Sequence, residues 1–175
     1  MRRYLIFLLF AFSFSFGQTK EFPLKSEDFS SILLNNEMYF GGVTSKETPF
    51  KIKFTHVIKN PEKPDTYLIS GVTDVEANKT DFLGELTFHE RHDVKNTPDQ
   101  MLLFGDIFFI ENGKDQHTGT FKGKVRVQTD KELIKERGFS TITFKGKWKN
   151  YSNTLNFDVW WANYEPNDIT KVIFK

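Results

Sequence analysis

The sequence contains no cysteine, and this absence excludes several kinds of protein. Disulfide bonds, thiol nucleophiles and thiolate metal sites all need a cysteine, as does a lipid anchor attached to a sulfur atom. A domain without such cross-links has to be held together by its hydrophobic core. The chain is well supplied for this, because its 175 residues include 20 Phe, 5 Tyr and 3 Trp.

The familiar catalytic motifs are also absent. The chain has no Gly-x-Ser-x-Gly elbow, no phosphate-binding loop and no dinucleotide fingerprint. The run His89-Glu90-Arg91-His92 is superficially similar to a zinc-protease motif, but that chemistry needs two histidines one helical turn apart. We interpret the run as a solvated loop at a strand end, and the isolated His56 and His117 as ordinary sheet and loop residues. The sequence therefore predicts no catalytic residue, no metal and no cofactor.

Residues 1–17 have the organisation of a secretory signal peptide. A short basic start precedes an apolar run over residues 5–16, and small residues including Gly17 precede Gln18. The alternative is a retained membrane anchor, but a spanning helix needs about 20 apolar residues, and this run is shorter and interrupted by serines. We expect export to the periplasm or the cell exterior, cleavage near Gly17-Gln18, no transmembrane segment after cleavage, and a single β domain over residues 18–175.

Three stretches alternate between apolar and polar residues with a period of two, which is typical of half-buried antiparallel strands. They cover residues 82–88, 120–128 and 140–149. Each contains a Phe-x-Gly word whose glycine falls on the apolar face, at Gly84, Gly123 and Gly146. A glycine there favours a sharp bend or a close backbone approach. We interpret the three as marks of a strongly curved sheet; cleared space for an internal ligand is the alternative.

Further strands are expected between clear turn signals. They are residues 38–43, 50–58, 66–75, 101–110 and 155–164, with a short terminal strand at 171–174. The turn signals include Asn60-Pro61, Ala77-Asn78-Lys79, Asn96-Thr97-Pro98-Asp99 and Asn112-Gly113. Short helices are expected at 26–33, where Ser26 precedes acids and spaced apolar residues, and at 130–137, which Gly138 ends.

Eight or nine antiparallel strands with one or two short helices predict an all-β fold. Similar spacings of glycine and asparagine around two successive hairpins favour a meander, in which each strand pairs with the next. The expected architecture is a closed or nearly closed barrel, and a β-sandwich is the alternative. Such a barrel is similar in architecture to lipocalin-like and avidin-like barrels, although the chain carries no motif of either family.

The strand predicted at 155–164 carries large rings on both of its faces. Phe157, Val159 and Trp161 fall on one face, and Asp158, Trp160, Ala162 and Tyr164 fall on the other. One ring is therefore expected on a surface, where an aromatic plane flanked by carboxylate and amide groups suits a sugar; packing under a helix, a loop or a second chain is the alternative. The candidate ligand-binding residues are Trp148, Asn156, Asp158, Trp160, Trp161, Asn163 and Tyr164.

Net charge is close to zero but unevenly placed. The formal charge is +1, and residues 18–175 keep 22 Lys and Arg against 23 acids, which indicates no nucleic-acid partner. Cations gather on outward strand positions, at Lys51, Lys53, Lys122, Lys124, Arg126, Lys145, Lys147 and Lys149. Like charges opposite each other on paired strands are destabilising, and an anionic surface would relieve them. Protection of strand edges by lysine is the alternative.

The leading functional prediction is an exported, non-enzymatic β-barrel that binds a ligand or an envelope partner, with glycans and lipids as candidate ligands. A structural or interaction subunit of the cell envelope is the second hypothesis, with the aromatic outer face as its contact surface. A glycoside hydrolase is the third. It rests on Asp158 and Glu165, two carboxyls that a fold can bring within the roughly 5 to 10 Å that such enzymes need.

Overall fold

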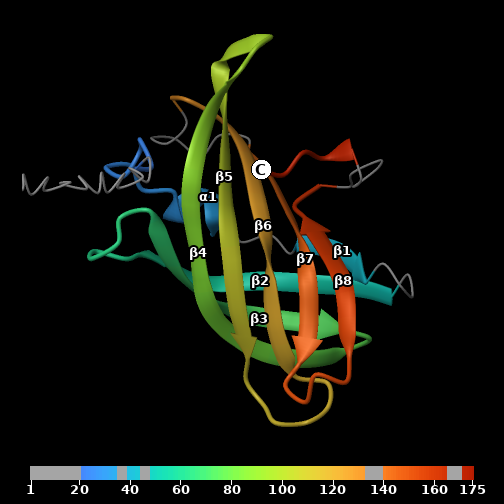
Figure 1. The fold of residues 1–175 in the computed structure, drawn as a ribbon. Coiled ribbons are helices and arrows are strands. Elements are labelled where there is room, and N and C mark those ends of the chain that lie inside the picture. Colours follow the sequence, from blue (N-terminus) through green and yellow to red (C-terminus); the bar gives the residue numbers. More distant parts are fainter. Residues whose placement is uncertain (1–20, 35–38, 44–47, 133–139, 165–170) are drawn as a thin grey trace, which may run out of the picture.

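The computed structural model describes residues 21–34, 39–43, 48–132, 140–164 and 171–175. These residues form one short helix and eight strands: α1 (Ser30–Leu33), β1 (Tyr39–Val43), β2 (Thr48–Lys59), β3 (Thr66–Val75), β4 (Asn78–Val94), β5 (Thr97–Glu111), β6 (Gly119–Asp130), β7 (Ser140–Asn150) and β8 (Asn156–Ala162). Each strand is antiparallel to the next, and β1 also pairs with β8, so the sheet closes into a ring (Figure 1). The predicted all-β meander with a barrel-like architecture is confirmed.

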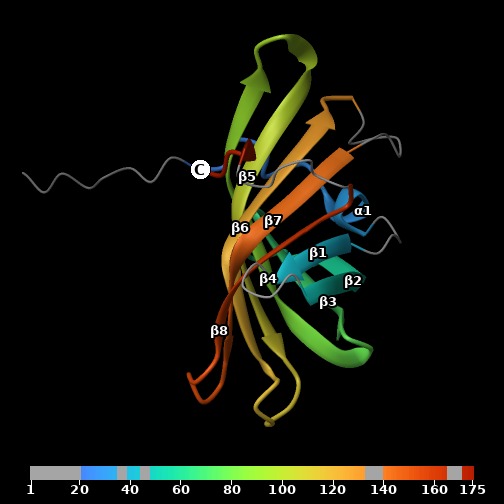
Figure 2. The same cartoon turned by 90° about the vertical axis from the view of Figure 1, so that its right-hand side faces the viewer.

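The alternation in the sequence explains which side of each strand faces inward. Val125 and Phe144 lie opposite each other in the β6–β7 register and are fully buried, whereas their neighbours Lys124 and Lys145 also lie opposite each other and are exposed. The same alternation runs through the other long strands. Figure 2 shows β6 and β7 on one side of the molecule and β1, β2 and β3 on the other. The buried apolar side chains of both groups belong to one core cluster.

The N-terminal segment before β1 closes one end of the barrel. Phe22, Phe29 and Leu33 are buried there, and the Phe29 ring packs against Tyr67 and Phe88 at centroid distances of 6.4 and 5.6 Å. Hydrogen bonds also fix the segment: Phe29 N donates to Tyr67 Oη (3.0 Å), and Tyr39 Oη donates to the Leu33 carbonyl (3.0 Å). This end is therefore plugged by the chain itself.

Aromatic rings fill the middle of the barrel. Trp161 is fully buried and stacks on Phe144, with a centroid distance of 4.8 Å and an interplanar angle of 19°. Phe50 and Phe121 pack against the same indole at 5.5 and 5.7 Å. Stacked and edge-to-face ring contacts of this kind add to the free energy gained from burial alone. The packed middle separates the plugged end from the opposite end, which is open.

The Phe-x-Gly glycines lie where neighbouring strands approach most closely. Gly123 and Gly146 are opposite each other in the β6–β7 register, and a Cβ added to Gly123 would lie 2.7 Å from the Gly146 Cα. A Cβ added to Gly84 would lie 2.7 Å from the Phe109 Cα. Close backbone approach explains these glycines, and cleared space for a ligand does not, because other side chains line the internal cavity described below.

The hairpin of β4 and β5 is longer than the sequence pattern indicated. β-Bulges interrupt the period of two near Phe88 and Asp93, which hides the continuation of β4 to Val94. The solvated-loop interpretation of residues 89–92 is therefore wrong, because they belong to β4 and His89 pairs with Asp106 of β5 at 2.8 Å. The turn contains only residues 95 and 96, and Pro98 and Asp99 already belong to β5.

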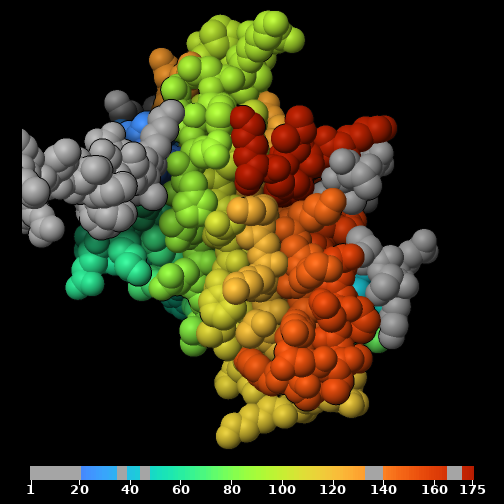
Figure 3. Space-filling model, viewed as in Figure 1, coloured from blue at the N-terminus to red at the C-terminus, as the bar shows by residue number. Residues whose placement is uncertain are grey.

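Two further local predictions differ from the structure and one lies outside it. The first helix is shorter than predicted, because Asp28 Oδ1 accepts from Ser30 N (2.8 Å) and the helix begins only there, not at Ser26. The predicted terminal strand is wrong: residues 171–175 form no strand and instead lie on the outer face of the sheet, where Lys175 Nζ is 5.8 Å from the Phe104 ring (Figure 3). The predicted helix at 130–137 falls largely outside the described residues.

Candidate functional site

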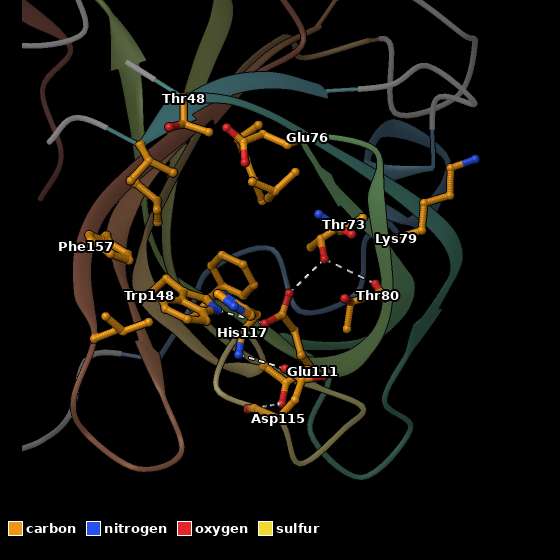
Figure 4. A pocket seen from close by; sticks show the side chains of 18 of the residues that line it. Thr48, Thr73, Glu76, Lys79, Thr80, Glu111, Asp115, His117, Trp148 and Phe157 are labelled. Carbon is orange, nitrogen blue, oxygen red and sulfur yellow. Dashed lines mark hydrogen bonds between the residues drawn. The ribbon is translucent and has the colours of Figure 1, made fainter. Parts of the chain in front are cut away.

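A cavity of about 810 Å³ opens at the end of the barrel opposite the N-terminal plug. It lies where the β3–β4, β5–β6 and β7–β8 connections gather, and the inward side chains of the adjoining strand ends line it (Figure 4). The aromatic core forms its floor. The cavity is therefore a pocket that ends inside the barrel.

Glu111 is a buried carboxyl in the wall of this cavity, with 5% of its surface exposed. It is the last residue of β5 and continues the inward series that includes Phe109. Three donors reach it from three other strands. Thr73 Oγ1 (β3) lies 2.8 Å from Oε1, while Trp148 Nε1 (β7) and Gly119 N (β6) lie 2.8 and 3.1 Å from Oε2.

Burial raises the pKa of the Glu111 carboxyl above its ordinary value, because removal from water disfavours the charged form. The hydrogen bonds from Trp148, Thr73 and Gly119 lower this pKa without offsetting the burial, and the charge of Asp115 raises it further. Glu111 therefore keeps its proton to a higher pH than an exposed glutamate does.

The two oxygens of Glu111 have different partners, which identifies the atom that takes the proton. Oε2 receives two N–H donors, whereas Oε1 faces the Thr73 hydroxyl, and that hydroxyl is also 3.2 Å from the Thr80 carbonyl. When Glu111 is neutral, Oε1 donates to Thr73 and Thr73 donates to Thr80. When Glu111 is ionised, Thr73 turns its proton to Oε1. The site accommodates either state by one hydroxyl rotation.

Aromatic rings form the apolar part of the cavity wall. Trp148 and Phe157, from β7 and β8, stack with a centroid distance of 5.8 Å and an interplanar angle of 10°. Phe50 and Phe121 line the deeper part, where they also contact the Trp161 ring of the floor. The cavity thus combines one buried carboxyl with several ring faces, which is the usual composition of a small-molecule site.

Loop residues hold the mouth of the cavity in place. Asn150 is 2% exposed, and its Nδ2 donates to the Gln116 carbonyl (3.1 Å), while its Oδ1 accepts from Leu155 N (2.9 Å). Tyr151 Oη donates to the backbone carbonyl of Glu111. These bonds tie the β7–β8 connection to the β5–β6 loop, so the walls around Glu111 are preorganised.

The predicted ligand-binding residues do not gather at one place. Trp148 lines the cavity, and Trp161 lies beneath its floor, where its Nε1 has no hydrogen-bond partner among the described residues. The others lie on or near the outer face, and their neighbours are as follows: Asn156 is exposed, Asp158 accepts from Lys147 (2.7 Å), the Trp160 ring covers Gly42, Asn163 accepts from Ile142 N (2.8 Å), and Tyr164 Oη is 2.7 Å from Thr143 Oγ1. The split of β8 into two aromatic faces was correctly predicted.

The basic strand positions lie on the outer face. β6 and β7 are paired, so that lysines lie opposite lysines as predicted. Lys122 is opposite Lys147, and Lys124 is opposite Lys145. Each pair has one lysine bound to an acid on a neighbouring strand: Lys124 to Asp106 and Lys147 to Asp158. Burial alone would raise the pKa of the Asp106 carboxyl, but hydrogen bonds from Lys124 and His89 hold it below its ordinary value.

Sequence reasoning missed Glu111, although a signal for it exists. Ile107 and Phe109 occupy alternate inward positions of β5, and Glu111 is the next residue in that series. An acid on the apolar side of a strand pattern is unusual, because a buried carboxyl needs partners. Its partners come from β3, β6 and β7, and no local pattern connects those strands in advance.

Among the described residues, no group of three or more His, Asp and Glu is placed to hold a metal ion, and no helix there has the length and apolarity that crossing a bilayer requires. Glu165, the second carboxyl of the predicted hydrolase pair, lies outside the described residues. No protein family, curated protein or solved structure matches this chain.

Proposed function

We propose that this protein binds a small amphipathic molecule in the cavity at the open end of its barrel. The observation that carries the proposal is the pairing of an open pocket of about 810 Å³ with a buried carboxyl in its wall that three protein donors hold in place. Ligand pockets of small molecules commonly enclose about 300 to 1,000 Å³ and combine apolar walls with a few placed polar groups. The cavity meets both criteria.

The division of the barrel interior supports binding in preference to a purely structural role. A protein that needed only stability would fill both ends, because an empty space forfeits packing contacts. Here the N-terminal segment fills one end, while the other end carries a polar group that costs stability to bury. Costly features of this kind are commonly retained at functional sites.

The proposal differs from the predicted sugar site on the outer face of β8. Asp158, the carboxylate of that site, is bound to Lys147, and Asn163 uses both ends of its amide on the backbone of residues 140 and 142.

Export of the chain remains part of the proposal, because the organisation of residues 1–17 supports it. A mature N-terminus near Gln18, found by terminal sequencing, is the expected result.

Titration with the fluorescent apolar amine N-phenyl-1-naphthylamine tests cavity binding. Its emission should rise in the presence of the wild-type protein and saturate at one equivalent. Val75→Trp, on the inward face of β3, should fill the cavity and reduce the affinity at least about tenfold, or about 1.4 kcal/mol. Val72→Trp adds the same ring on the outward face of the same strand and should leave the titration unchanged.

The two tryptophan variants also define failure. Equal titrations for Val75→Trp and Val72→Trp, with both variants folded by circular dichroism, would place the probe elsewhere and remove the proposal. So would the absence of any saturable emission change in the wild-type protein.

A second candidate function is self-association through an apolar outer patch. Leu83 and Ile110 are opposite each other on β4 and β5, are 63% and 37% exposed, and adjoin Phe108, which is 40% exposed. Contiguous exposed apolar side chains often mark an interface. Sedimentation of the wild-type chain should then show a dimer that Leu83→Lys weakens, whereas a monomer at all concentrations would eliminate this candidate.

A further inference from the structure

We propose that the ligand carries a cationic amine, which Glu111 binds as its counter-ion inside the cavity. This inference rests on the proposed function, since it names the chemical class of the molecule that the cavity holds. The juxtaposition behind it is a buried carboxylate, an aromatic ring bonded to it, and open space in front of both (Figure 4).

Glu111 has acceptor capacity that its three protein donors leave unused. An ionised carboxylate has about four acceptor positions. Oε2 uses two of them on Trp148 and Gly119, and Oε1 uses one on Thr73. One position at Oε1 is left, and Figure 4 shows the carboxylate directed toward the interior of the cavity. A ligand N–H donor fits this position without displacing any of the three protein donors.

The charge balance of the cavity also favours a cation. Among the described residues, Glu111 forms no ion pair with Lys or Arg. Its acidic neighbours at the mouth are Glu76 and Asp115, while the side chain of Lys79 extends away from the cavity. A buried carboxylate without a cation is unfavourable, and a bound ammonium would compensate it. An anionic ligand would instead add a second negative charge.

The Trp148 indole provides a third observation. Because its Nε1 donates to Oε2, the ring lies directly beside the carboxylate, and Phe157 stacks behind it. An indole N–H lies in the plane of its ring, so the carboxylate meets the edge of Trp148. The carbon atoms next to an ammonium at Oε1 would therefore pack beside an aromatic ring while the ammonium meets the charge. The apolar remainder of the ligand would extend along Phe50 and Phe121 toward the floor.

Calorimetric titration with three matched naphthalenes tests the inference. The probes are 1-naphthylmethylammonium, 1-naphthylmethanol and 1-naphthoate, which share the ring system and differ in charge. At neutral pH the wild-type protein should bind the ammonium about tenfold more tightly than the alcohol and should bind the carboxylate most weakly. Hydrogen bonds to charged partners are stronger than those between neutral groups, and the cost of dehydrating the ammonium limits the preference to about tenfold.

Matched variants assign the preference to one carboxyl. Glu111→Gln keeps the shape and the acceptor oxygen but loses the charge, so the ratio of ammonium to alcohol affinity should fall to about one. Glu85→Gln makes the same change at an exposed outward position of β4 and should keep the wild-type ratio. Thermal melting of each variant verifies that both remain folded.

The outcomes separate the inference from the function on which it rests. Equal affinity for the ammonium and the alcohol, or a preference for the carboxylate, overturns the inference while leaving a ligand-binding cavity in place. A preference that survives Glu111→Gln overturns it as well. If none of the three naphthalenes binds and the N-phenyl-1-naphthylamine titration also fails, the cavity function and the inference fall together.

Discussion

A single buried carboxyl, that of Glu111, determines much of the chemistry of this site. The residue is enclosed by Thr73, Trp148 and Gly119, and its raised pKa follows from burial that these three donors do not offset. Tyr151 responds to the same environment, because burial and then the charge of Glu111 raise the pKa of its hydroxyl. The protonation state of Glu111 therefore affects both the cavity and the loop at its mouth.

The stability of the protein should fall as pH rises through the raised pKa of Glu111. With the folded pKa above the unfolded one, the folded state binds more protons between the two values, so the free energy of unfolding decreases as pH increases there. Glu111→Gln mimics the neutral carboxyl, with its amide group able to donate to Thr73. The difference in urea midpoint between variant and wild type should therefore grow in favour of the variant with rising pH.

Urea unfolding at intervals from about pH 4 to 8 measures this difference. Subtraction of the two curves removes the groups that titrate alike in both proteins, including Asp93 and Asp106, whose pKa values are lowered. A difference that stays constant with pH would show that Glu111 has the same proton affinity in the folded and unfolded states.

Residue-scale prediction from sequence succeeded where the cause is local. The period of two predicts that Trp160 and Trp161 lie on opposite faces of β8, as they do in the structure. Which face is inside depends on packing against distant strands, and so does the burial of Glu111. Contacts such as Thr73 to Glu111, 38 residues apart, have no local signature.

At the scale of single elements, paired glycines allow β6 and β7 to approach closely. A Cβ at Gly123 or Gly146 would meet the opposite backbone, which cannot move without breaking the register. Gly123→Ala and Gly146→Ala should each destabilise the protein by about 1 to 3 kcal/mol, as overpacking commonly does. At about 2 to 4 °C of melting temperature per kcal/mol for a chain of this size, calorimetric scanning resolves the change.

Gly42 in β1 provides the matched control for these substitutions. A Cβ there would have its nearest neighbour, Trp160 Nε1, at 3.4 Å, which is an ordinary contact. Gly42→Ala should therefore be close to neutral or slightly stabilising. Equal losses for all three substitutions would contradict the close-approach explanation, since the cause would then be strand propensity alone.

The lysines of β6 and β7 give an element-scale prediction about anionic surfaces. Lys122 and Lys145 face the bound lysines of the opposite strand, so this region keeps an excess of positive charge. The wild-type protein should be retained on a sulfated-polysaccharide column at low salt and released by moderate salt, because such attraction is screened over about 8 Å at physiological ionic strength. Changing Lys122, Lys124, Lys145 and Lys147 to Gln should abolish retention.

Two results would leave protection of the sheet against aggregation as the role of these lysines. One is an unretained wild-type protein, and the other is retention that persists in the fourfold variant. A fourfold change of Lys to Gln at exposed positions outside this set of outward cations, at Lys63, Lys79, Lys95 and Lys114, controls for the loss of net charge.

Prediction of elements was most successful for regular strands and least successful where the pattern is interrupted. The bounds of β3 match the predicted residues 66–75, because clear turns flank an uninterrupted run. In contrast, bulges near Phe88 and Asp93 conceal the full length of β4. The segment at 171–175 has the composition of a strand, but β1 and β8 already pair with each other. A strand-like composition therefore did not lead residues 171–175 to pair with the sheet.

At the scale of the whole molecule, the barrel interior changes from plugged to packed to open along its axis. Phe29 and Leu33 occupy one end, Trp161 and Phe144 the middle, and Glu111 the wall of the open end. Composition and period predicted the barrel and its aromatic core. They did not predict this gradient, since the number of large residues at each level depends on the register of eight strands.

The indole N–H signals of the three tryptophans test the central claim, that ligands enter the cavity at the open end. Trp148 faces the cavity, Trp160 lies outside the barrel, and Trp161 lies beneath the floor, so each reports on a different place. In ¹H–¹⁵N spectra assigned with single Trp→Phe variants, 1-naphthylmethylammonium should shift the Trp148 signal strongly and leave the Trp160 signal in place. A shift of Trp160 with an unchanged Trp148 signal would contradict the account and place binding on the outer face.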